Sequence, residues 1–467
     1  MTSQDTRNGF IPALMTLALA AYAGFIAYSS ASFLPDDEDG VNFILGVKDY
    51  NPVFHQPHFP GYPVYVALGK IIALWAPSPE LALGLVSIIA SALSVWVVSC
   101  IARSETGAWG GIAASALLAG TGIFTSYSGK IFSEPLALLV LLLWMAALKN
   151  CKPRPRDWFL SGLSAGLLLG VRLSWWPFTV AGVYYAYRNS GIKNHLAGIC
   201  SGILVWLPVM VFVIGPTQLA DTAFDFVYGH FFDWGGAITS TNGSSHRFYD
   251  WRMNLAQALG VIGFEGFRLI NAVWIILLAA SSYYWIRGNE KVAVAIKMLI
   301  AGAALYAIWI MAGQNVSKTR HFLPFAPVAV ILTLPLFNRW PKAFTALALI
   351  LLLGGNVLRH DPVIKTPPVF NMAQWLEGAE NGSALFCGPA ERYFDLYPAK
   401  IPVISVKHGD SLRGIIKSRW PEPSAILVCD DIPGVKLTGA PEAVFAARPG
   451  DPVDRTLKIY KLAPDEI

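Results

Sequence analysis

Four acids in a row, Asp36 to Asp39, follow directly after the apolar run 10–33. Acids this dense beside a membrane span are costly unless they face water or a site. A carboxylate at the bilayer surface, next to apolar helices, is partly desolvated, and desolvation raises its basicity. We therefore predict that one or two of these four carboxylates take the proton of a hydroxyl group or position that hydroxyl. A solvated loop at the membrane surface is the alternative.

The second candidate segment is HQPHFPGYPVY, residues 55–65. Its prolines and its glycine make a rigid turn. The two histidines lack the spacing of metal ligands on a helix, and Pro57 excludes a regular helix between them, so no metal site is predicted here. His55, His58 and Tyr62 are expected to position a sugar or a phosphate, and packing of the tyrosine at the membrane surface is the alternative.

Basic side chains mark a third segment, KTRHFLPFAP at residues 318–327. Lys318, Arg320 and His321 stand at the outer entrance of a predicted span, where positive residues are under-represented. A lipid-linked phosphate at headgroup level would explain them, because the fork of an arginine matches a phosphate group. Binding of membrane lipid headgroups without catalysis is the alternative.

Two shorter segments add candidates to the same outer side. Lys130 and Glu134 lie where the second outer loop meets its next span, and Glu134 would bring a second carboxylate to the site. Ser-Glu-Pro at this point is also a common helix start, which is the structural alternative. Arg172, between two spans and beside two tryptophans, either joins the phosphate site or extends its side chain to the membrane interface.

The elements that must hold these residues are membrane helices. The chain has 467 residues, of which 54% are hydrophobic and 14% charged, whereas soluble domains carry about 25% charge. A net charge of +5 without a Lys/Arg-rich tract excludes nucleic acid as a partner. We predict a membrane all-α protein, a polytopic bundle of about 11 transmembrane helices. The predicted spans are residues 10–33, 80–101, 108–125, 133–149, 158–172, 174–187, 197–214, 268–286, 293–311, 322–338 and 342–358.

Lysine and arginine recur in every second loop, for example at Arg103, Arg154, Arg188, Arg287 and Arg339. The positive-inside rule then places the N-terminus in the cytoplasm. The outer side receives the loop 34–79, with a surface helix at 60–76, and the loop 215–257. The second loop carries His230 and His246 among aromatic residues, a composition typical of carbohydrate-binding surfaces. A bacterial inner membrane is the expected location.

Residues 359–467 are more polar than residues 1–358, which form the predicted transmembrane catalytic domain. Short β-like runs at 383–387, 401–406 and 425–429 alternate with helix-like stretches at 371–378 and 409–418. This pattern predicts a small, soluble, extracytoplasmic α/β domain. Cys387 and Cys429 fall in two of the runs and are expected to be free thiols, with a disulfide between them as the alternative.

Taken in order, these motifs resemble the GT-C superfamily of integral-membrane glycosyltransferases, which includes protein O-mannosyltransferases and lipid A aminoarabinose transferases. The resemblance rests on the acidic outer loop, the segment HFPGYPVY at residues 58–65, the Ser-Glu-Pro-Leu opening at 133–136 and RHFLPFAP at 320–327. It covers the membrane region to about residue 358.

The resemblance implies a polyprenyl-phosphate-linked sugar as donor and a hydroxyl on a glycan, lipid or protein as acceptor. Asp39, or Asp37 in the other alignment of the contiguous acids, would be the catalytic base of a single inverting displacement. Arg320 would hold the departing phosphate, helped by Lys318, Arg172 or Lys130. No cofactor is required, although some relatives use a divalent metal.

Two other classes of protein remain as alternatives. A transporter or flippase of lipid-linked sugars would place ionisable groups near the middle of the membrane. In this chain the ionisable groups gather instead in the outer loops. A non-catalytic membrane scaffold would tolerate replacement of Asp37 and Asp39, which separates it from an enzyme.

Overall fold

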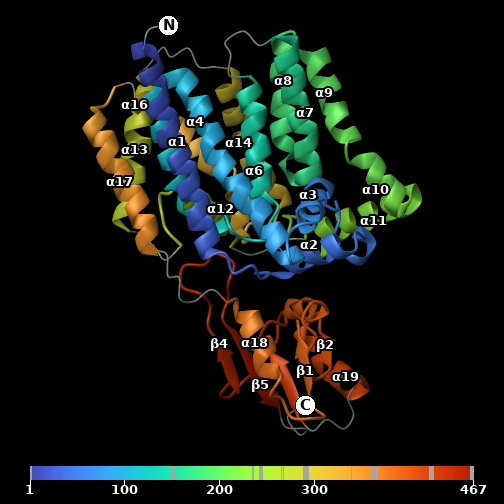
Figure 1. Ribbon diagram of the computed structural model, residues 1–467. Helices are drawn as coiled ribbons and strands as arrows, with labels where there is room; N and C mark the ends of the chain where they lie inside the picture. The colour runs from blue at the N-terminus through green and yellow to red at the C-terminus, as the bar shows by residue number, and fades with distance from the viewer. Residues whose placement is uncertain are drawn as a thin grey trace.

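A computed structural model describes residues 3–148, 154–233, 236–240, 246–264, 266, 268–287, 294–337, 339–359, 366–419 and 425–462. Parts of the long loop, 234–235 and 241–245, lie outside the described residues. The protein is a bundle of helices with a small sheet domain attached to one end (Figure 1).

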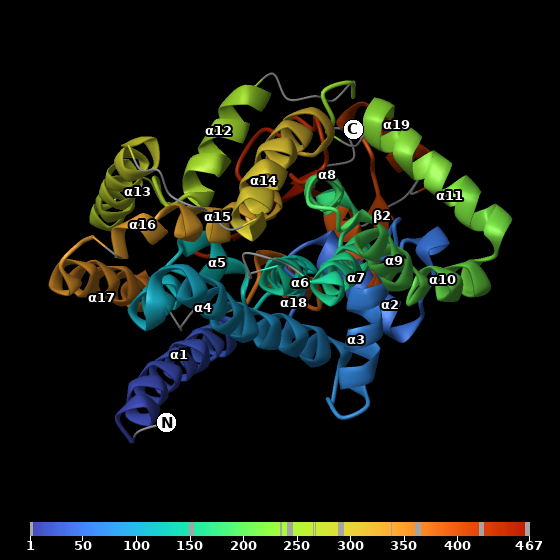
Figure 2. The same cartoon turned by 90° about the horizontal axis from the view of Figure 1, so that it is seen from above.

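The bundle is built from helices of very different lengths, and α1 and α17 lie on the opposite side from α10 when the bundle is seen from above (Figure 2). In chain order they are α1 (Ser3–Ser30), α4 (Pro79–Ala119), α5 (Gly122–Tyr127), α6 (Glu134–Ala147), α7 (Pro155–Val171), α8 (Trp176–Arg188), α9 (Ile192–Leu204), α10 (Leu207–Ile214), α12 (Arg247–Ala258), α13 (Leu269–Arg287), α14 (Val294–Gly313), α15 (Phe325–Leu332), α16 (Leu334–Phe337) and α17 (Lys342–Arg359).

Six helical segments among the described residues are long and apolar enough to cross a membrane. They are Phe10–Ser30, Pro79–Ala119, Ile192–Ile214, Leu269–Arg287, Val294–Gly313 and Thr319–Phe337. The single helix α4 covers two predicted spans and is kinked at Gly107, where φ is 76°. A membrane protein that is mostly helical is thus confirmed, whereas the count of eleven spans stays a prediction.

Close helix packing in the bundle depends on small residues. Helices α7 and α9 approach so closely that a Cβ atom on Gly162 would lie 2.0 Å from the carbonyl oxygen of His195. A Cβ on Gly202 would lie 2.9 Å from the Cα of Gly166. Any larger residue at these positions would push the two backbones apart, as is typical where membrane helices pack through glycine.

Shorter elements cover the end of the bundle that faces the sheet domain. They are α2 (Glu38–Lys48), η1 (Pro52–Phe54), α3 (Pro63–Ala73), η2 (Leu173–Trp175), α11 (Pro216–Tyr228), the π-helix η3 (Gly229–Asp233) and η4 (Thr319–Phe322). The acid run is therefore not a loop throughout, because its second half begins a helix. Asp37 caps α2 by accepting a hydrogen bond from the Gly40 amide at 3.1 Å. Glu38 and Asp39, in the first turn, interact favourably with the positive end of the helix dipole.

The turn after α2 is irregular. His55 and Tyr62 both have left-handed backbones, with φ of 59° and 44°. The bonds Gln56–Pro57 and Phe59–Pro60 are cis. Left-handed non-glycine residues cluster at functional sites, where surrounding structure holds them in place.

The C-terminal domain holds a five-stranded sheet in the order β2-β1-β3-β5-β4. Its elements are α18 (Pro368–Leu376), β1 (Ala384–Cys387), η5 (Pro389–Asp395), β2 (Val403–Ser405), α19 (Gly409–Arg419), β3 (Ile426–Cys429), β4 (Ala443–Phe445) and β5 (Leu457–Leu462). Strand β1 pairs in parallel with β2 and β3, and β5 pairs antiparallel with β3 and β4. The predicted sheet is confirmed, and Cys387 and Cys429 are buried free thiols.

Candidate active site

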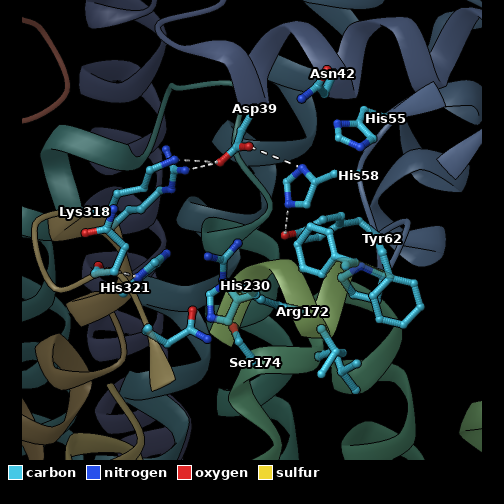
Figure 3. Close-up of a pocket in the computed structure, with 18 of the residues that line it drawn as sticks. Asp39, Asn42, His55, His58, Tyr62, Arg172, Ser174, His230, Lys318 and His321 are labelled. Atoms are coloured by element: carbon cyan, nitrogen blue, oxygen red, sulfur yellow. Dashed lines mark hydrogen bonds and ion pairs between the residues drawn. The ribbon is translucent and has the colours of Figure 1, made fainter. Parts of the chain in front are cut away.

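A cavity of about 570 Å³ opens where α2, the 55–62 turn, η2, α11, η3 and η4 meet. We call it the main cavity. Figure 3 shows Asp39, His58, Tyr62, Arg172 and Lys318 projecting into it from these separate segments. Sequence positions that lie almost 300 residues apart, such as 39 and 318, thus share one wall.

Arg320 is the centre of the charged wall, and its side chain is only 4% exposed. Its Nη1 pairs with Asp37, its Nη2 with Asp39, and its Nε lies 3.2 Å from Glu134 Oε1. All three guanidinium nitrogens therefore already face carboxylates. The side chain also lies over the ring of Phe132, with its Cζ 4.6 Å from the ring centroid.

Asp39 and Asp37 differ in what else they touch. Asp39 lines the main cavity, where its carboxylate lies 3.6 Å from Lys318 Nζ and 3.4 Å from His58 Nδ1. Asp37 caps α2 and faces a second cavity described below. Burial alone would raise the pKa of Asp39, but Lys318 and Arg320 outweigh it, so that its pKa lies below the usual value of a carboxyl.

Glu134 and Arg172 support this wall from behind. Glu134 is fully buried, and its Oε1 lies 3.1 Å from Arg172 Nη2 as well as close to Arg320. Arg172 Nη1 also donates to Ser133 Oγ at 3.1 Å. The sequence left two alternatives for Glu134, a helix start or a second carboxylate beside the site. The structure shows both features, because Glu134 lies in the first turn of α6 and contacts Arg320.

Histidine 58 connects the acid to the rigid turn. Its Nδ1 faces Asp39, and its Nε2 lies 3.0 Å from the hydroxyl of Tyr62. Its ring stacks on Phe226 of α11 at 5.4 Å between centroids. Burial lowers the pKa of His58 to about 4, against the raising effect of Asp39, so the imidazole is neutral near pH 7.

The opposite wall of the main cavity is aromatic. Trp176 of α8 and Trp309 of α14 meet edge to face at 5.4 Å, and Phe231 packs beside Trp309. His230 lines the cavity and its Nε2 lies 2.6 Å from the carbonyl oxygen of Gly313. A charged wall facing an apolar wall suits a ligand with a polar head and a hydrocarbon tail.

Most of the predicted site residues converge on this cavity. Its lining includes Asp39, His55, His58, Tyr62, Arg172, His230, Lys318, Arg320 and His321. Asp37 and Glu134 touch it through Arg320. Two predicted residues lie elsewhere, because His246 is exposed at the start of α12 and Lys130 belongs to an ion cluster between the domains.

Sequence reasoning missed Asn42 and, in the aromatic wall, Trp309. Asn42 lies three residues after Asp39, one turn along α2, and lines the same cavity. That spacing was the available signal, but it requires knowing that the acids begin a helix. Trp309 gave no signal, since aromatic residues are abundant throughout the membrane region, whereas Trp176 was noted beside Arg172 and Phe226 lies in the aromatic loop 215–257.

A second cavity of about 360 Å³ lies between the bundle and the C-terminal domain. We call it the interdomain cavity. Asp37, Tyr127 and Arg320 line it from the bundle, and Tyr393 and Arg455 line it from the C-terminal domain. Glu38, Lys318 and Arg320 line both cavities, so the charged wall separates the two spaces.

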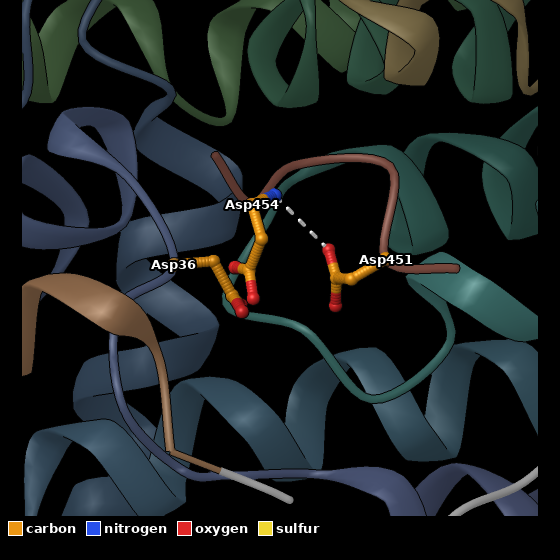
Figure 4. A group of neighbouring side chains, drawn as sticks. All are labelled: Asp36, Asp451 and Asp454. Carbon is orange, nitrogen blue, oxygen red and sulfur yellow. Dashed lines mark hydrogen bonds between the residues drawn. The ribbon is translucent and has the colours of Figure 1, made fainter. Parts of the chain in front are cut away.

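Asp36, the first acid of the run, belongs to a different cluster. Figure 4 shows it converging with Asp451 and Asp454 of the C-terminal domain, and one oxygen of each lies within 4.8 Å of the others. Carboxylates so grouped can hold a divalent metal. Here Lys130 Nζ lies 2.8 Å from Asp36 and 2.6 Å from Asp451, and Arg448 pairs with all three acids. Two cations thus bind the three acids together, as in an ionic contact between domains.

Comparison with known proteins places this chain beside glycosyltransferases in sequence over one segment and in fold over most of its length. The family model of dolichyl-phosphate-mannose-protein mannosyltransferases matches residues 57–214, and no curated protein matches the sequence significantly. Two crystal structures of ArnT from Cupriavidus metallidurans, bound to undecaprenyl phosphate and in the apo state, match with a TM-score of 0.56. Their identity to this chain is 13% and 12%, and each match covers 97% of this chain and 98% of the other.

A third solved structure is the oligosaccharyltransferase of Archaeoglobus fulgidus tethered with an acceptor peptide. It matches with a TM-score of 0.49 and 12% identity, covering 89% of this chain and 69% of that one. The resemblance to GT-C glycosyltransferases seen in the sequence is confirmed by the family model over 57–214, and the fold is similar to that of ArnT over nearly the whole chain.

Proposed function

We propose that this protein is a glycosyltransferase that moves a sugar from a polyprenyl-phosphate donor to an acceptor hydroxyl at the extracytoplasmic face of a bacterial inner membrane. The observation that carries the proposal is the main cavity, in which Asp39 stands beside Lys318 and Arg320 opposite an aromatic wall. A cationic centre suits a phosphate, and the apolar wall suits the first isoprene units of a lipid tail. ArnT, with the same fold, binds undecaprenyl phosphate.

Lys318 is the cation best placed to meet the donor phosphate directly. Its side chain is 34% exposed, whereas Arg320 is nearly enclosed and fully engaged by carboxylates. Arg172 also lines the cavity and adds a further guanidinium to the cationic surroundings, and the His321 side chain lines it as well. Arg320 then acts mainly through its charge, which reaches the phosphate across a few ångströms of low-dielectric protein.

The reaction follows as a single displacement with inversion. The acceptor oxygen forms a bond to the anomeric carbon while the bond from that carbon to the phosphate oxygen breaks. Asp39 takes the hydroxyl proton, and polyprenyl phosphate leaves as an anion stabilised by Lys318 and Arg320. Asp37, which caps α2 and faces the interdomain cavity, is the alternative base.

The low pKa of Asp39 in the donor-free protein does not conflict with its role as the base. The same two cations that depress its pKa would be attracted to the donor phosphate. A bound anion reduces their effect on Asp39 and so makes the carboxylate a better base when the donor is present.

The proposal is tested with purified protein in nanodiscs, a panel of radiolabelled polyprenyl-phosphate sugars and a membrane extract as acceptor. Wild type, Asp39→Asn, Asp37→Asn and Arg320→Ala are run side by side. We expect transfer by wild type from at least one donor, and loss of transfer in one aspartate variant with normal folding. Transfer that survives both aspartate substitutions would contradict the proposed base, and donor binding with translocation but without transfer would favour a flippase.

A further inference from the structure

One arginine of the C-terminal domain reaches into the walls of the main cavity. Arg392, in η5, donates from Nε to Asn42 Oδ1 at 2.7 Å. Its Nη2 donates to the carbonyl oxygens of Phe54 at 3.0 Å and His55 at 3.2 Å. Its Nη1 donates to Asp395 of the same η5, at 2.5 Å. A single rigid guanidinium therefore joins three segments of the chain.

The two bundle segments held by Arg392 carry the two side chains that meet at the reacting end of the cavity. Asn42 follows Asp39 by one turn of α2, and both line the main cavity. His55 precedes His58 by three residues in the rigid turn, and both also line it (Figure 3). The 3.4 Å contact between Asp39 and His58 thus depends on how α2 and the turn are spaced.

The surroundings of Arg392 make its bonds specific. Its side chain is 25% exposed, and Nη1 of the guanidinium contacts Asp395 while Nε and Nη2 face the bundle. The backbone carbonyls of residues 54 and 55 belong to a short 3-10 helix and its left-handed cap, so they project out of the turn instead of pairing within a long helix. Hydrogen bonds that involve a charged donor are about twice as strong as neutral ones.

The C-terminal domain does not depend on Arg392 for its attachment. The ion cluster of Asp36 with Lys130 and Arg448 joins the domain to the bundle separately. Val41 of α2 is buried in the hydrophobic core of the C-terminal domain. We therefore expect that removal of the Arg392 side chain leaves the domain docked. The distance between α2 and the turn is then no longer fixed by the bonds to Arg392.

We propose that Arg392 is a positioning residue of the active site, which acts from the C-terminal domain by holding Asn42 and the carbonyls of residues 54–55 and so sets the contact between Asp39 and His58. This inference rests on the proposed function for its kinetic consequences. In this proposal the C-terminal domain contributes to the active site without a catalytic residue, because its Arg392 holds two segments of the bundle that line the site. Misplacement of a reacting group by about 1 Å can cost about 10²-fold in rate.

The test compares Arg392→Ala with Arg392→Lys and with the matched control Asp395→Ala, which removes the partner within the domain and leaves the bonds to the bundle. We expect Arg392→Ala to lower kcat about 10- to 100-fold with a donor KM within about twofold of wild type. Arg392→Lys should recover part of the loss, since one ammonium can reach part of the acceptor set. Asp395→Ala should stay within about threefold of wild type.

A double-variant cycle shows whether Arg392 acts through Asp39. In the Asp39→Asn background, Arg392→Ala should lower the residual transfer much less than it does in wild type, because residues that act as a unit are not additive. Equal losses in both backgrounds would overturn the proposal, and so would an Arg392→Ala enzyme with wild-type kcat.

A measurement that is independent of turnover keeps the two proposals apart. Hydrogen exchange of backbone amides in residues 38–62 should increase in Arg392→Ala and not in Asp395→Ala, with exchange at Lys130 and residues 451–454 unchanged. Unchanged exchange in 38–62 would overturn the positioning role even if the enzyme were active. If wild type transfers no sugar while the exchange changes as expected, the proposed function fails and the contact stands.

Discussion

The ion cluster around Arg320 and the ion cluster around Arg448 both draw on the acid run 36–39, but their charges face different surroundings. In the first, Asp37, Asp39 and Glu134 surround Arg320 at the wall between two cavities. In the second, Asp36 meets Asp451, Asp454, Lys130 and Arg448 where the two domains join. One cluster is open to a ligand, and the other is closed by its own cations.

The difference shows that neighbouring acids in a sequence need not share a role. Asp36 precedes the helix cap and points towards the C-terminal domain, whereas Asp39 lies in the first turn of α2 and points into the main cavity. Asp36 lies before the N-cap and outside the helix, so the helical spacing that puts residues three apart on one face does not apply to it. Asp39 lines a cavity that a ligand can enter, whereas Asp36 contacts Lys130 and Arg448 at the junction of the two domains.

The largest expected difference between the clusters is kinetic. Asp39→Asn should lower kcat about 10²- to 10⁴-fold, because the amide cannot accept the hydroxyl proton, and it should leave the docking of the C-terminal domain unchanged. Asp36→Asn should keep kcat within about threefold of wild type while it weakens the domain contact. Transfer assays and limited proteolysis of the domain junction measure the two effects, and a catalytic loss in Asp36→Asn as large as that in Asp39→Asn would break the comparison.

Glu134 of the cluster around Arg320 is expected to contribute to the stability of the folded protein. Replacing it with alanine leaves Arg320 and Arg172 buried with one carboxylate fewer, and an uncompensated buried charge costs about 3–5 kcal/mol of unfolding free energy. Thermal unfolding in detergent should therefore move to a clearly lower temperature. Undecaprenyl phosphate should partly restore stability if it contributes the missing negative charge. An unfolding temperature equal to that of wild type would show that the guanidinium groups find other partners.

We predict that the stability of the protein depends on pH through His58, which contacts Asp39 in the cluster around Arg320. Burial lowers its pKa in the folded protein to about 4, from 6.5 for the unfolded chain. The neutral form is thus favoured by folding, so its contribution to stability is complete above pH 6.5 and is lost as pH falls towards 4, by up to about 3 kcal/mol. Thermal unfolding of wild type and His58→Gln between pH 7 and pH 4 measures this loss, and identical pH profiles would contradict the burial of a neutral imidazole.

The smallest expected effect compares one lysine from each cluster. Lys318→Ala should raise the donor KM about tenfold, which corresponds to the loss of one charge-assisted hydrogen bond to phosphate. Lys130→Ala should leave the donor KM within about twofold, since Lys130 is engaged by Asp36 and Asp451 and lines neither cavity. Titration of the donor with both variants at one ionic strength separates the lysines. A raised donor KM in Lys130→Ala would show that Lys130 does contact the donor phosphate, as the sequence analysis predicted.

Much of the fold was readable from local patterns. Apolar runs predicted a helical membrane protein, and alternating short runs after residue 366 predicted the strands of the small sheet. The same was true of the charged wall, because Asp39, His58, Lys318 and Arg320 were singled out by residue type alone and do meet. Lys130 was misleading for a physical reason, since the sequence contains no sign that Asp451 lies within 3 Å of it.

The sequence by itself determined which chemical groups are present and which segments are apolar enough to be helices, because hydropathy and helix starts are properties of short stretches. Only the tertiary structure decided how the four contiguous acids are divided, that Arg320 is shared by three carboxylates, and that Arg392 from the far end of the chain holds Asn42 and His55. These outcomes depend on contacts between residues from 94 to 412 positions apart in the chain. Packing of the whole bundle brings such segments together, and no local pattern in the chain encodes the distance between them.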